Sequence, residues 1–303
     1  MTDFLSLNAP RVLGASGIAV GPIAWGMWRL HGTDVSAADR LVRTALDVGV
    51  SLFDTADIYG FDGSTGFGAA EGLLGRVLAA DPALRGRFTL SSKGGIVPGT
   101  PYDSTAEYLV SACEASLQRL CTDHIDLYQI HRPDILAHPE EVAGALARLR
   151  DAGKIGAAGV SNYSVSQTRA LQSFLPFPLV SHQPEFSALH IEPLGDGVLD
   201  QAIELRMAVL AWSPLGGGRL AGAGEDARAR AVIDVLDRIA ARDAVPRTAV
   251  ALAWVLAHPS HPIALIGTQR DNRIREAAGA LDVRLTRADW YAILTASRQA
   301  KLP

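Results

Sequence analysis

Four residues with acid–base side chains end or follow separate apolar runs in the first half of the chain. Asp54 closes one such run and Tyr59 comes five residues later, Lys93 ends a second run, and His131 follows a third. Lys93 is one of only three lysines. Desolvating an ammonium at the end of an apolar strand costs on the order of several kcal/mol unless a carboxylate meets it. We therefore predict a pair between Lys93 and Asp54, beside side chains suited to proton transfer.

The elements that must position these residues alternate short apolar runs with longer amphipathic ones. That alternation favours a parallel sheet with crossover helices. Strands are expected near residues 21–25, 50–54, 87–93, 125–131, 156–160, 178–182, 207–212 and 262–266. This series suggests a closed barrel, whose C-terminal face would gather residues from distant parts of the sequence.

Capping patterns mark the helices between these strands. Ser36, Ser104 and Ser164 each precede an acid or amide by three residues, which is typical of a capping box. Pro139 at a first-turn position and Gly153 after the last turn delimit a further helix. Residues 12–20 are expected to form a small hairpin before the first strand.

The bulk properties exclude several classes of protein. The 303 residues carry a net charge of −4 and have a sequence pI near 6.1, so we expect no nucleic-acid or membrane partner. The first residues do not resemble a signal peptide, and a cytoplasmic location is expected. Cys113 and Cys121 are interpreted as buried free thiols, and no spacing indicates a metal site. Residues 1–303 are expected to form a single domain.

Motifs along nearly the whole chain resemble those of the aldo-keto reductase family. They comprise Gly26-Met27-Trp28, Phe53-Asp54-Thr55-Ala56 with Tyr59-Gly60, Ser92-Lys93, His131-Arg132-Pro133-Asp134, Gly159-Val160-Ser161-Asn162, Gln183, Trp212-Ser213-Pro214-Leu215-Gly216 and Ile266-Gly267. The pairing of His-Arg-Pro-Asp with Leu-Gly-Gly-Gly-Arg resembles a bacterial branch. The resemblance implies a (β/α)8 TIM barrel with an N-terminal β-hairpin closing the barrel floor.

The same resemblance implies reduction of an aldehyde or ketone by NADPH, with NAD as a possible substitute. Asp54, Tyr59, Lys93 and His131 match the catalytic tetrad. Tyr59 would donate the proton, Lys93 would lower the pKa of the phenol, Asp54 would hold Lys93, and His131 would offer a ring N–H to the substrate oxygen.

The resemblance also implies a cofactor site. Ser161, Asn162 and Gln183 match carboxamide-binding positions, and Trp212 matches an aromatic residue that stacks on nicotinamide. The glycine-rich loop would approach the pyrophosphate, although a flexible surface loop is the alternative. The full expected set is Gly26, Met27, Asp54, Ser161, Asn162, Gln183, Trp212, Ser213, Leu215, Gly216, Gly217, Gly218, Arg219, Gly267, Thr268, Arg270, Arg273 and Glu276.

The adenosine end departs from the better-known family pattern. Thr268 and Gln269 stand where Lys-Ser is expected, and Ala277 replaces an asparagine that contacts adenine. Arg270 and Arg273 remain as candidates for the adenosine 2′-phosphate, helped by the following helix start. Their alternative is an ordinary basic helical face, to which Arg275 is assigned.

Loop residues over the nicotinamide would bind the small-molecule carbonyl substrate, and we expect Trp28, Ile58, Phe61, Arg132 and Tyr163 among them. Arg132 favours polar or anionic carbonyl compounds, unless it pairs with Asp134 or another loop acid instead. Two other functions stay open at this point. One is a cofactor-binding redox sensor or regulatory subunit with little turnover, and the other is a barrel hydrolase or lyase without nicotinamide.

Overall fold

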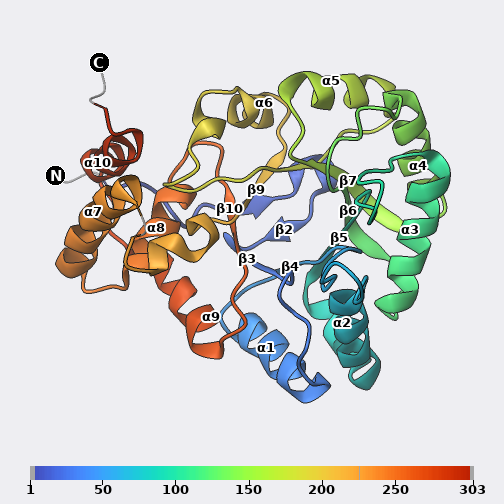
Figure 1. Ribbon diagram of the computed structural model, residues 1–303, viewed down its shortest axis with the longest axis horizontal. Helices are drawn as coiled ribbons and strands as arrows, with labels where there is room; N and C mark the ends of the chain where they lie inside the picture. Colours follow the sequence, from blue (N-terminus) through green and yellow to red (C-terminus); the bar gives the residue numbers. More distant parts are fainter. Residues whose placement is uncertain (1–3, 225, 301–303) are drawn as a thin grey trace.

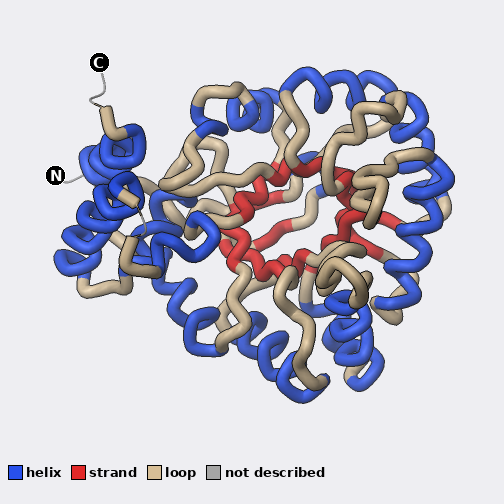
Figure 2. Tube along the Cα trace, in the orientation of Figure 1, coloured by secondary structure: helices blue, strands red, loops and turns tan. Residues whose placement is uncertain are grey.

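Parallel strands form a closed barrel at the centre of the protein. The computed structural model describes residues 4–224 and 226–300. Neighbouring strands pair in the order β10-β3-β4-β5-β6-β7-β8-β9, and the ring closes on itself (Figure 2). Their bounds are β3 Ile23–Gly26, β4 Leu52–Asp54, β5 Thr89–Gly94, β6 Ile125–Ile130, β7 Ile155–Ser161, β8 Ser181–Gln183, β9 Ala208–Trp212 and β10 Ile263–Ile266. The predicted (β/α)8 barrel is confirmed.

Helices surround the barrel and connect consecutive strands, as Figure 1 shows. They are α1 Val35–Asp47, α2 Ala69–Ala80, α3 Ala106–Arg119, α4 Pro139–Asp151, α5 Val165–Phe174, α6 Val198–Glu204, α7 Ala227–Asp243, α8 Arg247–Leu256, α9 Asp271–Ala278 and α10 Arg287–Arg298. Short 3-10 turns lie at Gly14–Ser16, Pro82–Arg87, Glu192–Leu194, Gly216–Ala221 and Gly279–Asp282. None of the helices in the described ranges is long and apolar enough to cross a bilayer.

The expected hairpin is present and covers the N-terminal end of the barrel. Strands β1 Arg11–Val12 and β2 Ala19–Val20 pair antiparallel. Leu13 and Val20 of the hairpin belong to the same buried cluster as Leu52, Leu127 and Leu210 from the barrel strands. The hairpin therefore closes the barrel floor with apolar side chains and leaves the opposite end for chemistry.

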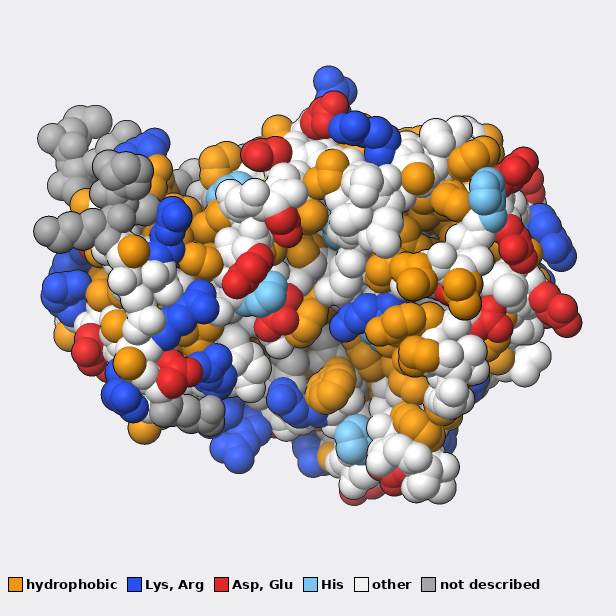
Figure 3. All heavy atoms as spheres, turned by 45° about the horizontal axis from the view of Figure 1, so that its top comes forward, with side chains coloured by type: hydrophobic (Ala, Val, Ile, Leu, Met, Phe, Trp, Pro, Cys, Tyr) orange, Lys and Arg blue, Asp and Glu red, His pale blue; other side chains and the backbone are white. Residues whose placement is uncertain are grey.

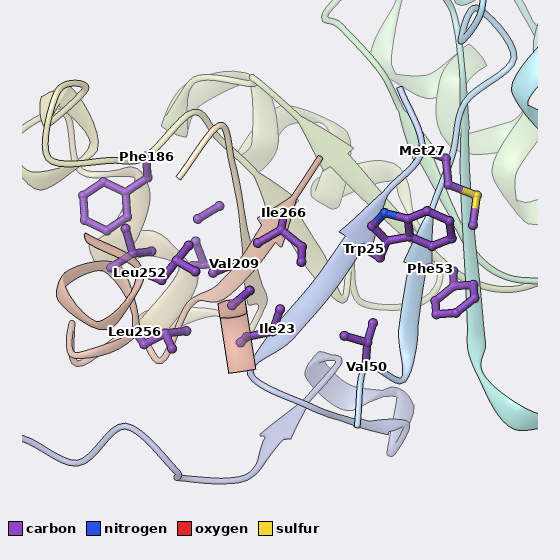
Figure 4. Packing of buried hydrophobic residues seen from close by; sticks show 14 of the residues in the cluster. Ile23, Trp25, Met27, Val50, Phe53, Phe186, Val209, Leu252, Leu256 and Ile266 are labelled. Atoms are coloured by element: carbon purple, nitrogen blue, oxygen red, sulfur yellow. The ribbon is translucent and has the colours of Figure 1, made fainter. Parts of the chain in front are cut away.

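A second and larger core lies between the strands and the surrounding helices. Trp25 and Phe53 from neighbouring strands meet edge to face, with ring centroids 5.4 Å apart. Figure 4 shows Trp25, Met27 and Phe53 together. Because both faces of the strands are covered, β3, β9 and β10 consist of nearly continuous apolar runs, whereas β5 and β8 carry polar side chains. Charged side chains of both signs are interspersed over the face shown in Figure 3.

The helix starts confirm some sequence predictions and correct others. Ser164 forms the expected capping box with Gln167, and α4 begins at Pro139. Ser36 does not cap α1, because Asp34 accepts a hydrogen bond from the Ala37 N–H and the helix begins earlier.

Ser104 likewise does not cap α3. Its own N–H donates to Asp134, and the neighbouring Thr105 takes the capping position. Cys113 is a buried free thiol as predicted, whereas the prediction for Cys121 was wrong, because it follows the end of α3 and its side chain is exposed.

Candidate active site

The four acid–base residues meet at the C-terminal ends of three neighbouring strands. Lys93 on β5 donates from Nζ to Asp54 Oδ2 at 2.6 Å, to the Thr55 carbonyl oxygen at 2.8 Å and to the Tyr59 hydroxyl at 3.1 Å. The Lys93 and Asp54 side chains are both fully buried. The predicted ion pair is therefore present, and its ammonium joins the carboxylate to the phenol.

A layer of polar side chains inside the barrel holds the Asp54 carboxylate. Its Oδ1 accepts hydrogen bonds from Ser91 Oγ at 3.0 Å and Gln183 Nε2 at 3.1 Å. Gln129 Nε2 donates to Ser91 Oγ at 3.0 Å, and its Oε1 accepts from Ser181 Oγ at 3.2 Å. The sequence analysis missed Ser91 and Gln129. Each lies two residues before a tetrad residue, Lys93 or His131, so strand alternation offered a signal.

Tyr59 lies in the loop after β4, and the conformation of this loop requires a glycine at position 60. Gly60 has φ +96°, and a Cβ there would lie 2.7 Å from the Ala69 side chain at the start of α2. The Tyr59 ring stands edge to face with Trp28 and with His131, at centroid distances of 6.3 Å and 5.6 Å. The hydroxyl accepts from Lys93, while the ring lies against the imidazole.

Burial and charge act in opposite directions on the pKa values of this pair. Burial alone would lower the pKa of Lys93, but Asp54 and Tyr59 raise it above its ordinary value, which keeps the ammonium charged. Burial raises the pKa of Tyr59, and Lys93 lowers it. The Lys93 ammonium acts on Tyr59 in the predicted direction. The pKa of Tyr59 is nevertheless raised, not lowered as expected, because desolvation of the phenolate is the larger effect.

His131 follows β6 and is held by its backbone, whose N–H donates to the Gly94 carbonyl at 2.9 Å. Burial, followed by the charges of Lys93 and Arg132, lowers the pKa of His131 well below its usual value, so the imidazole is neutral. Its Nδ1 is buried without a hydrogen-bond partner in the described chain. A neutral ring can donate one N–H to a ligand without repelling Lys93.

A second buried carboxyl group lies beside the tetrad. Asp57 lies in the loop after β4 and is fully buried. Burial and the nearby Glu71 carboxylate raise the pKa of Asp57 to about 8. Glu71 itself pairs with Arg119 at 2.7 Å and accepts from Ser92 Oγ at 2.5 Å. Sequence patterning could not reveal this group, because α2 and α3 bury it.

Two other acids, Asp126 and Asp134, have structural roles. Asp126 accepts from the Leu90 N–H and pairs with Arg85 at 2.9 Å. Asp134 accepts from the N–H groups of Ser104 and Leu136. Both carboxylates hold loops or strand ends rather than facing the tetrad. Within residues 4–224 and 226–300, no group of three or more His, Cys, Asp or Glu side chains is arranged to hold a metal.

The residues expected at the carboxamide form a hydrogen-bonded cluster of their own. Asn162, at φ +58°, donates from Nδ2 to Ser161 Oγ at 2.6 Å and accepts from Trp212 Nε1 at 3.0 Å. Ser161 Oγ donates to the Gln183 carbonyl at 2.9 Å. Trp212 is half-buried, and the Arg132 guanidinium lies 5.6 Å from its ring centroid. The cluster joins Ser161, Asn162 and Trp212 to the backbone of Gln183, whose side chain instead donates to Asp54.

The glycine-rich loop is ordered as a short 3-10 turn after β9. Ser213 and Gly216 both have positive φ, as do Gly217 and Gly218. A Cβ at Gly217 or Gly218 would meet nothing within 4 Å, so the backbone there faces open space. Arg219 forms an ion pair with Asp226, and Leu215 packs against the core.

The adenosine-end candidates lie after β10 on the exposed start of α9. Arg270, Arg273 and Glu276 are exposed. The two arginine side chains have no hydrogen-bond or ion-pair partner among the described residues, whereas Glu276 accepts from Asn272 at 3.4 Å.

The Thr268 carbonyl accepts from Trp25 Nε1 at 2.9 Å, and the Gly267 carbonyl accepts weakly from Arg29 at 3.5 Å. Gly26, which ends β3, and Met27, which follows it, are buried, and the Met27 side chain has no exposed surface.

The expected substrate residues differ in how far they reach the surface. Trp28 is 59% exposed, and Ile58 and Phe61 are half-buried. Tyr163 is buried in the main core, so its side chain is not exposed at the mouth of the barrel. Arg132 donates to the His131 carbonyl at 3.0 Å and makes no ion pair with Asp134 in the described structure. The predicted alternative, an Arg132–Asp134 pair, is therefore wrong.

Comparison with known proteins agrees with this geometry. Residues 22–297 match the model of the aldo/keto reductase family. The chain is 54% identical to a 6-dehydroglucose reductase of Novosphingobium aromaticivorans, with the whole of both chains aligned. It is 37% identical to a 6-dehydroglucose reductase of Agrobacterium fabrum, covering 94% of this chain and 97% of the relative. It is 38% identical to the oxidoreductase YdhF of Escherichia coli, covering 92% and 94%. The chain belongs to the aldo/keto reductase family of oxidoreductases.

Proposed function

We propose that this protein is an NADPH-dependent reductase that converts the aldehyde of a polyhydroxylated, sugar-type substrate to a primary alcohol, with 6-dehydroglucose as the first candidate. The observation that carries the reaction type is the position of Lys93 Nζ, 2.6 Å from Asp54 and 3.1 Å from the Tyr59 hydroxyl. The substrate proposal rests on the two relatives named as 6-dehydroglucose reductases.

The four tetrad side chains divide the proton-transfer work. Tyr59 donates its phenolic proton to the carbonyl oxygen as that oxygen becomes an alcohol. Lys93 stabilises the phenolate left behind, and Asp54 keeps Lys93 charged. Neutral His131 offers a ring N–H to the same oxygen and orients it. Because burial raises the pKa of Tyr59, the ammonium beside it is needed to bring proton donation within reach at neutral pH.

The residues along the barrel mouth fit a nicotinamide dinucleotide. Bound NADPH would supply the hydride. Trp212 would support the nicotinamide ring, with Ser161, Asn162 and Gln183 near its carboxamide. The open backbone at Gly217 and Gly218 leaves room for phosphate oxygens. Arg270 and Arg273 would meet the 2′-phosphate, which is the basis for NADPH over NADH, and their guanidinium groups have no competing partner in the described chain.

Polar groups around the mouth suit a substrate with several hydroxyls. The half-buried Arg132 guanidinium lies near Trp212, and its planar donors can bind hydroxyl or carboxylate oxygens. Trp28, which is 59% exposed, offers a flat apolar surface on the other side of Tyr59. Arg132→Leu should lower kcat/KM for 6-dehydroglucose about tenfold or more, because one charged hydrogen bond is removed. For benzaldehyde the loss should be small, and equal losses for both substrates would place Arg132 in the scaffold.

The decisive experiment is steady-state reduction of 6-dehydroglucose with NADPH and with NADH, followed by loss of cofactor absorbance and by product identification. Turnover of 6-dehydroglucose with a higher kcat/KM than for 4-nitrobenzaldehyde supports the proposal. Turnover of simple aldehydes alone would support a reductase but would rule out 6-dehydroglucose as its substrate. Tight retention of cofactor with negligible turnover would instead favour a redox sensor.

A further inference from the structure

A cavity at the barrel floor, on the opposite end from the tetrad, has two arginines and a histidine in an otherwise largely apolar lining. It has a volume of about 300 Å³. Its walls come from the hairpin, the end of α6 and the turn after it, and the starts of β9 and β10. They are formed by Pro10, Arg11, Val12, Ala202, Ile203, Arg206, Met207, Ala208, Pro259, Ser260, His261 and Ile263. No Asp or Glu is part of this lining.

Arg11 is the buried charge at the centre of this cavity wall. Its side chain is only 3% exposed. It donates to the carbonyl oxygens of Pro262, Leu256 and Leu7 at 3.3, 3.3 and 3.4 Å, and to that of Ala9. These contacts hold the guanidinium in place, but carbonyl dipoles leave its net charge uncompensated. Burial lowers the pKa of Arg11, and no carboxylate counters that effect.

Two further cationic or titratable side chains face the same cavity. Arg206, at φ +54°, and His261, at φ +48°, both lie in left-handed turns that bring them to the rim. Both are exposed, and neither side chain has a hydrogen-bond or ion-pair partner among the described residues. Arg11 also lies close enough to lower the pKa of His261, after the effect of burial. Two guanidinium groups and an imidazole that can donate a ring N–H thus line one cavity, and its lining holds no acid.

We propose that this floor cavity binds a phosphate-type oxyanion, free or as part of a small phosphorylated metabolite, between Arg11, Arg206 and His261. The Arg206 fork is exposed and matches phosphate oxygens in paired hydrogen bonds. The buried Arg11, whose donors already bind carbonyl groups, adds the attraction of its charge where the local dielectric is low. The cavity exceeds the size of a phosphate group, which leaves room for an attached organic part. The site is separate from the cofactor phosphates, which would lie at the other end of the barrel.

The test is calorimetric titration of inorganic phosphate into enzyme saturated with NADP, at constant ionic strength. The parent should show one saturable site, and Arg206→Gln should weaken it about tenfold or more, since charged hydrogen bonds are removed. Arg76→Gln, at an exposed arginine on α2, is the matched control and should leave affinity unchanged. The same titration with glucose 6-phosphate distinguishes a free anion from a phosphorylated metabolite.

Location is tested separately from affinity. A crystal soaked in tungstate should place the ion in contact with Arg11 and Arg206, and the Arg206→Gln crystal should lose it. The absence of a saturable heat, equal affinity in Arg206→Gln and Arg76→Gln, or tungstate only beside Arg270 would each overturn the proposal. Because Arg206 and His261 are exposed rim residues, these variants do not depend on replacing the buried Arg11, and carbonyl reduction is not their readout.

Discussion

The two ends of the proposed cofactor site satisfy their polar groups in different ways. At the tetrad, Lys93 and Asp54 are fully buried and already bonded to one another and to the barrel interior. At the adenosine end, Arg270 and Arg273 are exposed and have no partner in the described chain. The fold thus prearranges the groups proposed for the chemistry, whereas those proposed for adenosine recognition have no partner within the described chain. Substitutions at the first end should change catalysis and stability together, and those at the second should change affinity alone.

Tyr59→Phe should produce the largest effect on activity. The hydroxyl is the proposed proton donor, and Lys93 keeps its bonds to Asp54 and Thr55 when it is removed. We expect kcat/KM for carbonyl reduction to fall by about 10²- to 10⁴-fold, the usual range for general acid catalysis, with little change in cofactor Kd. Tyr291→Phe, at an exposed tyrosine on α10, is the control. A Tyr59→Phe enzyme that retains most of its activity would rule out Tyr59 as the acid.

Lys93→Met tests whether the buried pair also maintains the fold. Removing the ammonium leaves the Asp54 carboxylate buried without a counter-charge, which costs about 3–5 kcal/mol. Thermal unfolding should show this loss, and the double variant Lys93→Met/Asp54→Asn should recover much of the stability but none of the activity. If the double variant is as unstable as the single one, the pair does not act as a coupled unit.

Arg270→Ala or Arg273→Ala should weaken NADPH binding by about 10- to 100-fold, because one charged hydrogen bond to phosphate contributes about 1.5–3 kcal/mol. NADH lacks the 2′-phosphate, so its Kd should barely move, and thermal stability without cofactor should stay unchanged. Arg275→Ala is the matched control on the same exposed helix. Equal losses for both cofactors would show that these arginines serve the helix rather than the phosphate.

The same contrast explains what the sequence could predict. A lysine at the end of an apolar strand needs a carboxylate, so Lys93 and Asp54 could be paired without coordinates. Ser91 and Gln129 follow from strand alternation once the tetrad is placed. The N-cap of α1 was misassigned because Asp34 and Ser36 are both good capping residues, and local sequence does not decide between them.

Long-range burial was beyond the sequence patterns. The Asp57 carboxyl owes its environment to side chains from α2 and α3, such as Tyr108, whose hydroxyl lies 3.5 Å from Asp57 Oδ2. Tyr163 looked like a loop residue at the mouth, but it packs into the main core. Which of two neighbouring loop side chains turns inward depends on packing between elements far apart in the sequence.

Asp57→Asn should produce the smallest effect on activity of these substitutions. It tests whether burying a carboxyl group beside the tetrad lowers the stability of the folded protein. The pKa of Asp57 is raised to about 8 in the folded protein, so the native state holds a proton that the unfolded chain releases from about pH 4 upward. The parent therefore loses stability as the pH rises from about 4 to about 8.

Asparagine is neutral at every pH and removes that loss. The Tm of the variant should exceed that of the parent at pH 9, and the difference should vanish or reverse near pH 4. Asp271→Asn, at an exposed carboxylate on α9, should shift Tm by the same small amount at both pH values. A difference between Asp57→Asn and parent that does not grow with pH would show that the Asp57 carboxyl is already ionised at neutral pH.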